Sequence, residues 1–504
     1  MGSPRKHIVV VGAGPGGLSA AMLLAARGFK VTLLEKDSVV GGRNASFDIN
    51  GYKFDTGPTF LMMKFILDEI FWEAGRDSQD YLDFFKLDPM YRLEFYGSRL
   101  EPTTDHSAMR DQIARVFPGN EDGFNRFLVK EQTRYEKLYP CLQKDYTSIT
   151  RYLSKEMIRA LPYLGLGKSV MDILKHYFTE DDIKLAFTFQ SKYLGMSAWE
   201  CPGAFAMLPF VEHKQGIYHT MGGLCEISKA MAKVCKEHGV EIRLNTPVKE
   251  LFLEGKKTKG VKLEDDSIVM ADEVVLNADF GYAMQNLVPE GALKKYKPDN
   301  LIKMDFSCST FMLYLGLDKI YNLPHHTIYF AKDYRQNIED VFQNKRLSKE
   351  ASLYIRNASI TDSSLAPEGH SAVYVLVPVP NLSAKIDWAK EKTHFRERIL
   401  KVMEIRGGMT RLRSHIKEEL VLTPDDWEAK GIYLGATFNL SHKLTQMLYL
   451  RPHNRFEELD NCYLVGGGTH PGSGLPTIYE SGRIAANMIC HEHNVQFVSK
   501  NKQV

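Results

Sequence analysis

The chain has 504 residues, 44% hydrophobic and 25% charged, the composition of an ordinary folded protein with length for about three domains. Its 64 Lys+Arg and 62 Asp+Glu residues give a net charge of +2, which provides no bulk attraction for nucleic acid. We therefore expect no nucleic-acid partner. Seven widely spaced cysteines without a C-x-x-C pair argue against a disulfide framework and a metal site. A reducing, cytoplasmic compartment fits this pattern best.

The N-terminal region contains an uncharged stretch, Ile8 to Ala26, that is long enough to cross a bilayer. Its middle carries four glycines and Pro15, which favour a turn between a strand and a helix. We therefore expect neither a transmembrane helix nor a cleaved signal peptide here.

A glycine motif joins the first predicted strand to the first predicted helix. Ile8–Val11 is a β-branched run typical of a buried parallel strand, and Leu18–Arg27 has the period of a helix. Between them, a G-x-G-x-x-G motif is formed by Gly12, Gly14 and Gly17. The first glycine permits a tight turn, the second lets a pyrophosphate approach the backbone, and the third lets helix and strand pack closely. The helix N-terminus then faces the phosphate.

The second predicted strand, Lys30–Leu34, ends at Glu35. A carboxylate at this place accepts hydrogen bonds from ribose hydroxyl groups. It also repels a 2′-phosphate, which argues against NADP and leaves NAD or FAD as the expected nucleotide.

The segments that follow are Gly41-Gly42-Arg43 and Phe54–Thr59. This arrangement resembles the flavoprotein superfamily that includes amine oxidases and carotenoid desaturases. The resemblance implies that FAD is the cofactor and that Gly42 and Arg43 line its pyrophosphate and flavin. It also implies that Val248 contacts the adenine through its backbone.

A second strand, glycine loop and helix occur near the end of the chain. Asn461–Val465 has the pattern of a strand and Ile478–Ile489 that of a helix, and the loop between them contains Gly467, Gly468, His470 and Gly474. Amide groups at such a helix start suit an edge of the flavin that gains negative charge on reduction. The run from Asn461 to Ser481 is similar to the C-terminal signature of bacterial-type phytoene desaturases. Further stretches resemble the same family: Gly222–Leu224, Asn277–Asp279, Thr361–Gly369, Val377–Pro380 and Arg451–Asn454.

Motifs at both ends that serve one cofactor imply a discontinuous nucleotide domain. We expect an α/β architecture in which residues 1–100, 215–285 and 455–504 form a Rossmann-like FAD-binding domain. Residues 101–214 and 286–454 then form an α+β substrate-binding domain.

Residues 150–210 combine apolar side chains at helical spacing with basic neighbours such as Arg151, Lys155 and Lys168. This pattern suits a helix that lies in a membrane interface, and equally the apolar face of a core helix. A substrate dissolved in lipid favours the first interpretation. We expect a chain that lies on the membrane surface without spanning it.

Three residues are candidates for catalysis. Glu156 and Arg159 are three residues apart on one predicted helix and can face the same way. The resemblance aligns them with an acid and an arginine proposed as catalytic in bacterial-type desaturases, although there the acid is Asp. His470 is a candidate for proton transfer. The alternatives are a surface ion pair and a hydrogen-bonded structural histidine.

The family resemblance implies FAD-dependent desaturation of a long polyene in carotenoid biosynthesis, by hydride transfer to the flavin and loss of a proton. A phytoene-type hydrocarbon is the favoured substrate. A later hydroxylated or half-cyclised carotenoid is the alternative, because polar aromatic residues gather in the middle of the chain: Tyr193, His213, Tyr218 and His219. A carotenoid isomerase or oxygenase stays open. The non-enzyme alternative is an escort protein that carries a prenylated partner. Such a protein needs no intact nucleotide-binding motif, so the presence of Gly12, Gly14 and Gly17 argues against this alternative. Nothing in the sequence indicates an oligomeric state.

Overall fold

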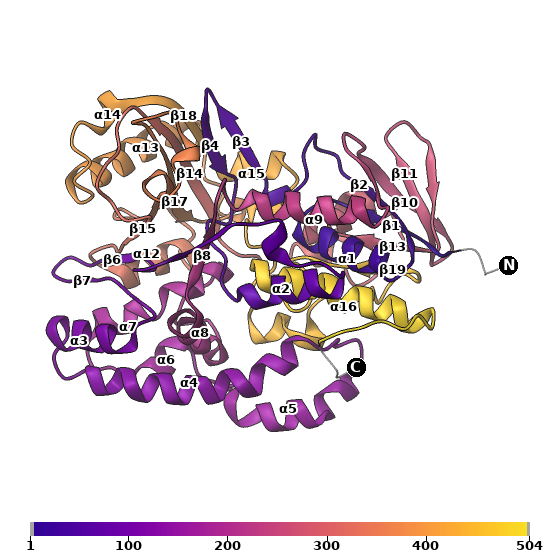
Figure 1. Cartoon of the computed structure of the whole chain (residues 1–504), viewed down its shortest axis with the longest axis horizontal. Helices are drawn as coiled ribbons and strands as arrows, with labels where there is room; N and C mark the ends of the chain where they lie inside the picture. Colours follow the sequence, from indigo (N-terminus) through magenta and orange to yellow (C-terminus); the bar gives the residue numbers. More distant parts are fainter. Residues whose placement is uncertain (1–4, 501–504) are drawn as a thin grey trace.

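The computed structural model describes residues 5–500, apart from the side chain of Tyr193. Residues 1–4 of the predicted segment 1–100 and residues 501–504 of the predicted segment 455–504 therefore lie outside the described part. A parallel sheet and its helices occupy the right half of Figure 1. A large sheet lies at the upper left and a group of helices at the lower left.

The parallel sheet has five strands in the order β19-β13-β1-β2-β9, and every pairing in it is parallel. Its inner strands β1 and β13 are nearly continuous apolar runs because both faces of the sheet are covered. The strands expected over Ile8–Val11 and Lys30–Leu34 are confirmed. The bounds are β1 His7–Val11, β2 Lys30–Leu34, β9 Glu241–Arg243, β13 Glu273–Leu276 and β19 Cys462–Leu464.

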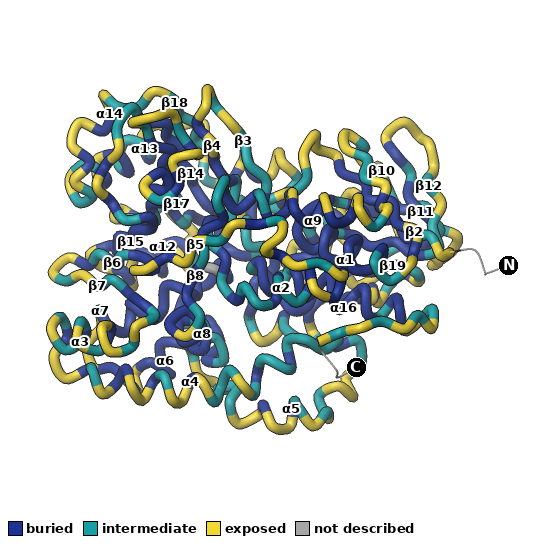
Figure 2. The backbone as a smooth tube through the Cα atoms, in the orientation of Figure 1, coloured by how far each residue is buried: buried dark blue, intermediate teal, exposed yellow. Residues whose placement is uncertain are grey.

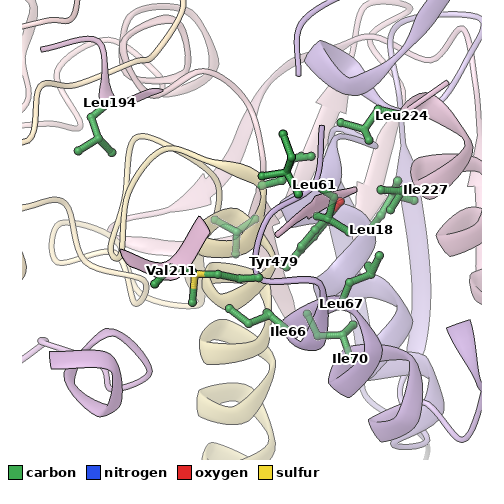
Figure 3. Packing of buried hydrophobic residues seen from close by; sticks show 14 of the residues in the cluster. Leu18, Leu61, Ile66, Leu67, Ile70, Leu194, Val211, Leu224, Ile227 and Tyr479 are labelled. Carbon is green, nitrogen blue, oxygen red and sulfur yellow. The ribbon is translucent and has the colours of Figure 1, made fainter. Parts of the chain in front are cut away.

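Four helices surround this sheet: α1 Pro15–Ala26, α2 Lys64–Glu73, α9 Cys225–Glu237 and α16 Leu475–Glu492. Figure 3 shows Leu18 of α1, Tyr479 of α16 and Ile227 of α9 in one apolar cluster. The first and last of these helices touch closely, since a methyl group at Gly482 would lie 2.6 Å from the carbonyl oxygen of Gly16. The beginning and the end of the chain therefore share one core.

A buried ionic network joins α1, α2 and α16. Arg483 is fully buried, and its Nη1 lies 2.9 Å from Glu69 and 3.1 Å from Glu73. It also forms an ion pair with Glu480, while Arg27 pairs with Glu73 at 2.9 Å. Buried charges persist only when they are paired and hydrogen-bonded, so this network fixes how the three helices meet.

The second large sheet is mixed, with seven strands in the order β18-β14-β17-β16-β15-β6-β7. One face packs against helix α13 (Trp388–Ile405), and the other carries an aromatic cluster with Tyr52 and Phe54. Its strands are β6 Arg92–Glu94, β7 Arg99–Leu100, β14 Ser309–Leu317, β15 His326–Tyr329, β16 Leu353–Asn357, β17 Ser371–Val379 and β18 Ile416–Leu422.

Smaller elements complete these two halves. An antiparallel three-stranded sheet and two strand pairs contain β10 Val248–Glu254, β11 Lys257–Leu263, β12 Ile268–Met270, β3 Ser46–Ile49, β4 Tyr52–Asp55, β5 Phe84–Leu87 and β8 Ile217–Thr220. The short helices are α10 Phe280–Tyr282, α11 Pro298–Leu301, α12 Tyr334–Phe342, α14 Leu412–His415 and α15 Pro424–Ala429.

The helical region contains α3 His106–Val116, α4 Glu121–Leu142, α5 Lys155–Ala160, α6 Val170–Leu174, α7 Asp181–Ala186 and α8 Met207–Gln215. Its two parts differ, because α6 buries Val170, Ile173 and Leu174 in the core, whereas α5 lies at the outer edge with much exposed surface (Figure 2). The core-helix alternative thus holds for α6. Among residues 5–500, no helix is long and apolar enough to cross a membrane.

Candidate cofactor and active site

The turn between β1 and α1 leaves no room for side chains at its glycines. Gly12 has a φ of +96°, and a methyl group at Gly17 would lie 2.1 Å from the carbonyl oxygen of Gly12. At Gly14 it would lie 2.7 Å from Nδ2 of Asn277. Among the described residues, no side chain caps the start of α1. Its first amide groups are therefore free to bind an anion.

Glu35 lies directly after β2 and holds the glycine turn. Its Oε2 accepts a hydrogen bond of 2.6 Å from the amide of Ala13, and its Oε1 accepts one of 3.0 Å from Asp37. Burial raises the pKa of Glu35, and these two amide donors offset that shift in part. The amide of Thr246 donates to the carbonyl oxygen of Glu35 at 2.8 Å, which brings the start of β10, with Val248, toward the same edge of the sheet.

Gly42 and Arg43 lie close to the first glycine turn in space. A methyl group at Gly42 would lie 3.5 Å from Cα of Gly14. Nη2 of Arg43 donates to Asp279 at 2.5 Å, and its Nη1 donates to the carbonyl oxygen of Thr437 at 3.2 Å. About a third of the Arg43 side chain is exposed, while Asp279 is buried. This pair fixes the guanidinium beside the first turn.

The C-terminal glycine loop lies against the N-terminal turn. A methyl group at Gly16 would lie 3.1 Å from the amide nitrogen of Gly466. Within the loop, Gly467 is crowded by Ser473 and Gly468 by Phe280, and Gly474, with a φ of +110°, directly precedes α16. The structure therefore brings the predicted glycines of both chain ends to one place.

Asn277 lies at the centre of this place, although the sequence analysis gave it no role beyond its family resemblance. Its Nδ2 donates to the carbonyl oxygen of Gly12 at 3.2 Å, and its side chain also approaches Gly14, Gly16 and Gly466. The signal was present: Asn277 is a polar residue directly after β13, the neighbour of β1. Because parallel strands end at the same edge, such a residue must lie near the glycine turn.

Two of the catalytic candidates lie apart from this edge. Glu156 and Arg159 are on α5, where Arg159 is exposed and Glu156 forms an ion pair of 2.6 Å with Lys144. The hydrogen bond from Lys144 lowers the pKa of Glu156. The structure thus gives Glu156 a partner that sequence spacing did not indicate.

His470 connects the C-terminal loop to the segment after α4. Its buried ring lies 4.9 Å from the ring of Tyr146. Burial, and the nearby charge of Arg451, lower the pKa of His470 to about 3, so the imidazole is neutral near neutral pH. Arg451 in turn donates to the carbonyl oxygens of Gly467 and Thr469.

The polar residues noted in the middle of the chain are dispersed. His213 is buried, and its Nδ1 lies 3.0 Å from the carbonyl oxygen of Thr103. His219 forms a buried pair of 2.9 Å with Asp362, and Tyr218 is half-buried. The side chain of Tyr193 lies outside those described.

Comparisons with known proteins agree with this geometry. The family of flavin containing amine oxidoreductases matches residues 15–490. A 4,4'-diapophytoene desaturase (4,4'-diapolycopene-forming) from Methylomonas sp is 54% identical over 98% of this chain and 96% of the relative. The chain belongs to the carotenoid desaturases within that family. An all-trans-zeta-carotene desaturase from Myxococcus xanthus is 36% identical over 97% of this carotenoid desaturase and 94% of the relative.

A solved putrescine oxidase variant has the same fold, with a TM-score of 0.62 at 14% identity, covering 97% of this chain and 99% of that one. This similarity confirms the expected α/β fold. Membership in the flavin-containing family confirms FAD as the cofactor. The site fits such a group, because the crowded glycines carry no side chain that would keep a pyrophosphate from the main chain, and Glu35 would offer a carboxylate to a ribose.

Proposed function

We propose that the chain is a FAD-dependent desaturase that introduces carbon–carbon double bonds into a long acyclic polyene of the phytoene type. The convergence of the two glycine turns and Glu35 at one sheet edge carries this proposal, in a chain similar over nearly its whole length to a diapophytoene desaturase. Within this substrate class, identities of 54% and 36% favour diapophytoene over zeta-carotene.

The residues of the site have distinct tasks in this proposal. When bound, FAD would supply the oxidising power for the reaction, as the acceptor of a hydride from a saturated carbon of the polyene. Gly12, Gly14 and Gly17 keep the backbone close to the pyrophosphate, and Glu35 holds the turn beside the ribose. Arg43, fixed by Asp279, places a positive charge beside the first turn.

The fate of the proton is a separate question. The neutral ring of His470 can accept a proton, and Glu156 is paired with Lys144 at the outer edge of the molecule. A role in proton transfer for Glu156, Arg159 or His470 stays a prediction. An allylic cation next to the reacting carbon makes the proton acidic enough that water can also accept it.

We also propose the domain division expected from the sequence. Residues 1–100, 215–285 and 455–504 supply all five strands of the parallel sheet, which supports a discontinuous FAD-binding domain. Residues 101–214 and 286–454 supply the helical region and five strands of the mixed sheet, which supports a substrate-binding domain.

We further propose that the chain attaches peripherally to a membrane surface. Apolar side chains of and around α5, here called the α5 apolar patch, are more than half exposed: Ile149, Leu153, Ile158, Leu161 and Leu166. The exposed cations Lys155 and Arg159 lie on the same helix. Such a combination favours insertion into the interface of an anionic membrane, where the substrate is dissolved.

Anaerobic mixing of the FAD-loaded protein with diapophytoene or phytoene in lipid vesicles tests the reaction. We expect bleaching of the flavin absorbance and a product that absorbs at longer wavelength, with diapophytoene reacting faster. A flavin that stays oxidised with both polyenes would contradict the desaturase proposal. Flavin that fails to bind at all would contradict the site.

A further inference from the structure

A cavity of about 480 Å³ lies between the C-terminal half of α16 and the segment that leads from α4 to α5. Its lining includes Asn487 and Met488 of α16, Lys144 and Arg151 of the segment, and Arg455. This volume is that of a small-molecule site, which typically measures about 300–1,000 Å³. None of the candidate cofactor or catalytic residues lines it, so the cavity is separate from the site described above.

The cavity lies next to the α5 apolar patch. Arg151 belongs to a short 3₁₀ helix, between Ile149 and Leu153, whose side chains are 65% and 75% exposed. Lys144 reaches α5 itself through its ion pair with Glu156, and α5 lies below α16 in Figure 1. A protein that inserts the α5 apolar patch into a membrane therefore brings the cavity to the level of the lipid headgroups.

Two guanidinium groups in the wall of the cavity have unused donors. Nη2 of Arg151 donates to Asp145 at 2.8 Å and Nη2 of Arg455 donates to Glu492 at 3.0 Å, and both arginine side chains are about half exposed. Within residues 5–500 each guanidinium makes only this one side-chain hydrogen bond, so its other N–H groups stay available. Asp145 and Glu492 each accept a further hydrogen bond within the protein. The surplus is therefore one of donors, which suit the oxygen atoms of a phosphate group.

Asn487 adds an acceptor without a partner to the same cavity. The residue is only 7% exposed, and its Oδ1 is buried without a hydrogen bond to any described residue. Buried polar atoms are almost always paired in folded proteins, so this oxygen indicates a ligand with a donor group. The arginines need an acceptor and Asn487 needs a donor, so one ligand that fits the cavity carries both.

The charge of the cavity decides between the ligands that carry both groups. The lysine and the two arginines in its wall are each balanced by a carboxylate in an ion pair. A zwitterion leaves this balance unchanged, whereas a ligand with a net charge does not. An ammonium group supplies N–H donors for Asn487 and is attracted to Asp145 and Glu492. A phosphoethanolamine headgroup combines this ammonium group with a phosphate.

We propose that this cavity binds the headgroup of a membrane phosphatidylethanolamine, with the phosphate on Arg151 and Arg455 and the ammonium group on Asn487. Met488 lies beside them as an apolar contact for the methylene groups of the headgroup. The inference rests on the peripheral attachment proposed above and names the lipid that is recognised. A headgroup held in the cavity fixes the orientation of the protein on the membrane, which the insertion of apolar side chains alone does not.

Soluble headgroups test the cavity without a membrane. The FAD-loaded protein is titrated calorimetrically with glycerophosphoethanolamine and with glycerophosphocholine, whose ammonium group carries methyl groups in place of N–H donors. The variants are Asn487→Leu, Asn487→Asp and Arg455→Met. The control is Arg335→Met, which breaks an exposed ion pair with Glu339 on α12. Flavin absorbance and thermal unfolding of each variant show whether the fold is kept.

We expect Asn487→Leu and Arg455→Met each to weaken the binding of glycerophosphoethanolamine by about tenfold or more, because each removes a charge-assisted hydrogen bond. Asn487→Asp keeps the acceptor oxygen and should bind at least as well as wild type, and Arg335→Met should bind as wild type does. The wild type should bind glycerophosphocholine about tenfold more weakly. Equal binding of the two headgroups, or unchanged binding in Asn487→Leu, would overturn the proposal.

Co-sedimentation with vesicles then tests the membrane as the source of the headgroup. Vesicles of phosphatidylcholine with a fixed fraction of phosphatidylglycerol are compared with vesicles in which phosphatidylethanolamine replaces part of the phosphatidylcholine. The wild type should bind the second kind more tightly, and Asn487→Leu should remove this gain. A gain that Asn487→Leu keeps would overturn the cavity and leave attachment through the α5 apolar patch standing. A wild type that binds glycerophosphoethanolamine but neither vesicle would contradict the peripheral attachment itself, and with it the lipid source.

Discussion

The two glycine turns and the α5 apolar patch differ in how much space surrounds their side chains. A methyl group would lie 2.1 Å from the nearest atom at Gly17 and 2.3 Å at Gly468. In the patch, Leu153 and Ile158 are 75% and 59% exposed. The turns depend on the shape of the main chain, which close packing fixes. The patch depends on what the fold leaves uncovered, so its side chains can be replaced without disturbing the core.

The largest expected effect comes from filling the first turn. Gly14→Val places a branched side chain where one carbon would already lie 2.7 Å from Nδ2 of Asn277. Bound FAD should fall about 100-fold or more, measured as flavin absorbance after purification. The control is Gly97→Val, because no described atom lies within 4 Å of the corresponding position. Near-normal flavin content in Gly14→Val would show that the turn does not bind the nucleotide.

The buried ionic network gives the next largest effect. Arg483→Met removes the positive charge shared by Glu73 and Glu480, which should lower the free energy of unfolding by about 3–5 kcal/mol. The matched change Arg455→Met breaks a surface pair with Glu492 and should cost less than about 1 kcal/mol. Thermal unfolding of both variants compares the two losses in the free energy of unfolding. Equal losses would contradict a special role for the burial of Arg483.

His470 lies in the C-terminal glycine loop and packs against Tyr146, in the segment that leads to the α5 apolar patch. The pH dependence of stability tests whether its ring is buried there. Its pKa of about 3 is below the ~6.5 of an unfolded histidine, so the unfolded chain binds the proton first. The stability that the neutral ring confers is present above about pH 6.5 and is lost on acidification, by about 1.4 kcal/mol per pH unit.

His470→Phe removes this dependence. Between about pH 6.5 and pH 5, the free energy of unfolding of the wild type should fall about 2 kcal/mol further than that of the variant. His394, which is exposed, is changed to Phe as the control for the loss of one imidazole. Identical pH profiles for His470→Phe and wild type would mean that the ring is solvated.

Changes in the α5 apolar patch should have the smallest effect on the folded protein. Leu153→Asp together with Ile158→Asp should weaken binding to anionic vesicles about tenfold or more, because each inserted side chain contributes about 1.5–3 kcal/mol. FAD content and unfolding should stay near wild type. Ile405→Asp is the control, since Ile405 is 70% exposed at the end of α13 on another face. Unchanged co-sedimentation of the double variant would place the membrane contact elsewhere.

The sequence predicts those parts of the molecule that local chemistry determines. The first two strands follow from β-branched runs, and the fold and the FAD cofactor follow from glycine spacing and family resemblance. Helix α1 begins at Pro15, earlier than the predicted Leu18, because Gly16 and Gly17 are helical here and not part of a loop. The small size of Gly16 and Gly482 lets α1 and α16 approach each other at this point.

Other features depend on contacts between residues that are far apart in the sequence, which no local pattern predicts. Four side chains lie opposite one another across β14, β17, β16 and β15 only because these strands pair in one register: Tyr314, Tyr374, Arg356 and His326. Arg483 meets Glu73 across more than 400 residues of chain, and neither residue stands in a distinctive context. Sequence reasoning found Asn277 only as part of a motif, because its task is to lie between two turns that are far apart in the chain.

The order of strands in the parallel sheet bears on how the protein is made. Strands β1 and β2 leave the ribosome first, but their neighbour β13 comes some 240 residues later, and β19 with α16 comes last. A nascent chain therefore lacks the C-terminal glycine loop until synthesis is almost finished. Pairings between strands so far apart in the sequence also form slowly. Because the proposed FAD site needs both glycine turns, we expect the cofactor to bind only after the last segment has been made, and a chain that ends before residue 455 should keep the first glycine motif yet carry no flavin.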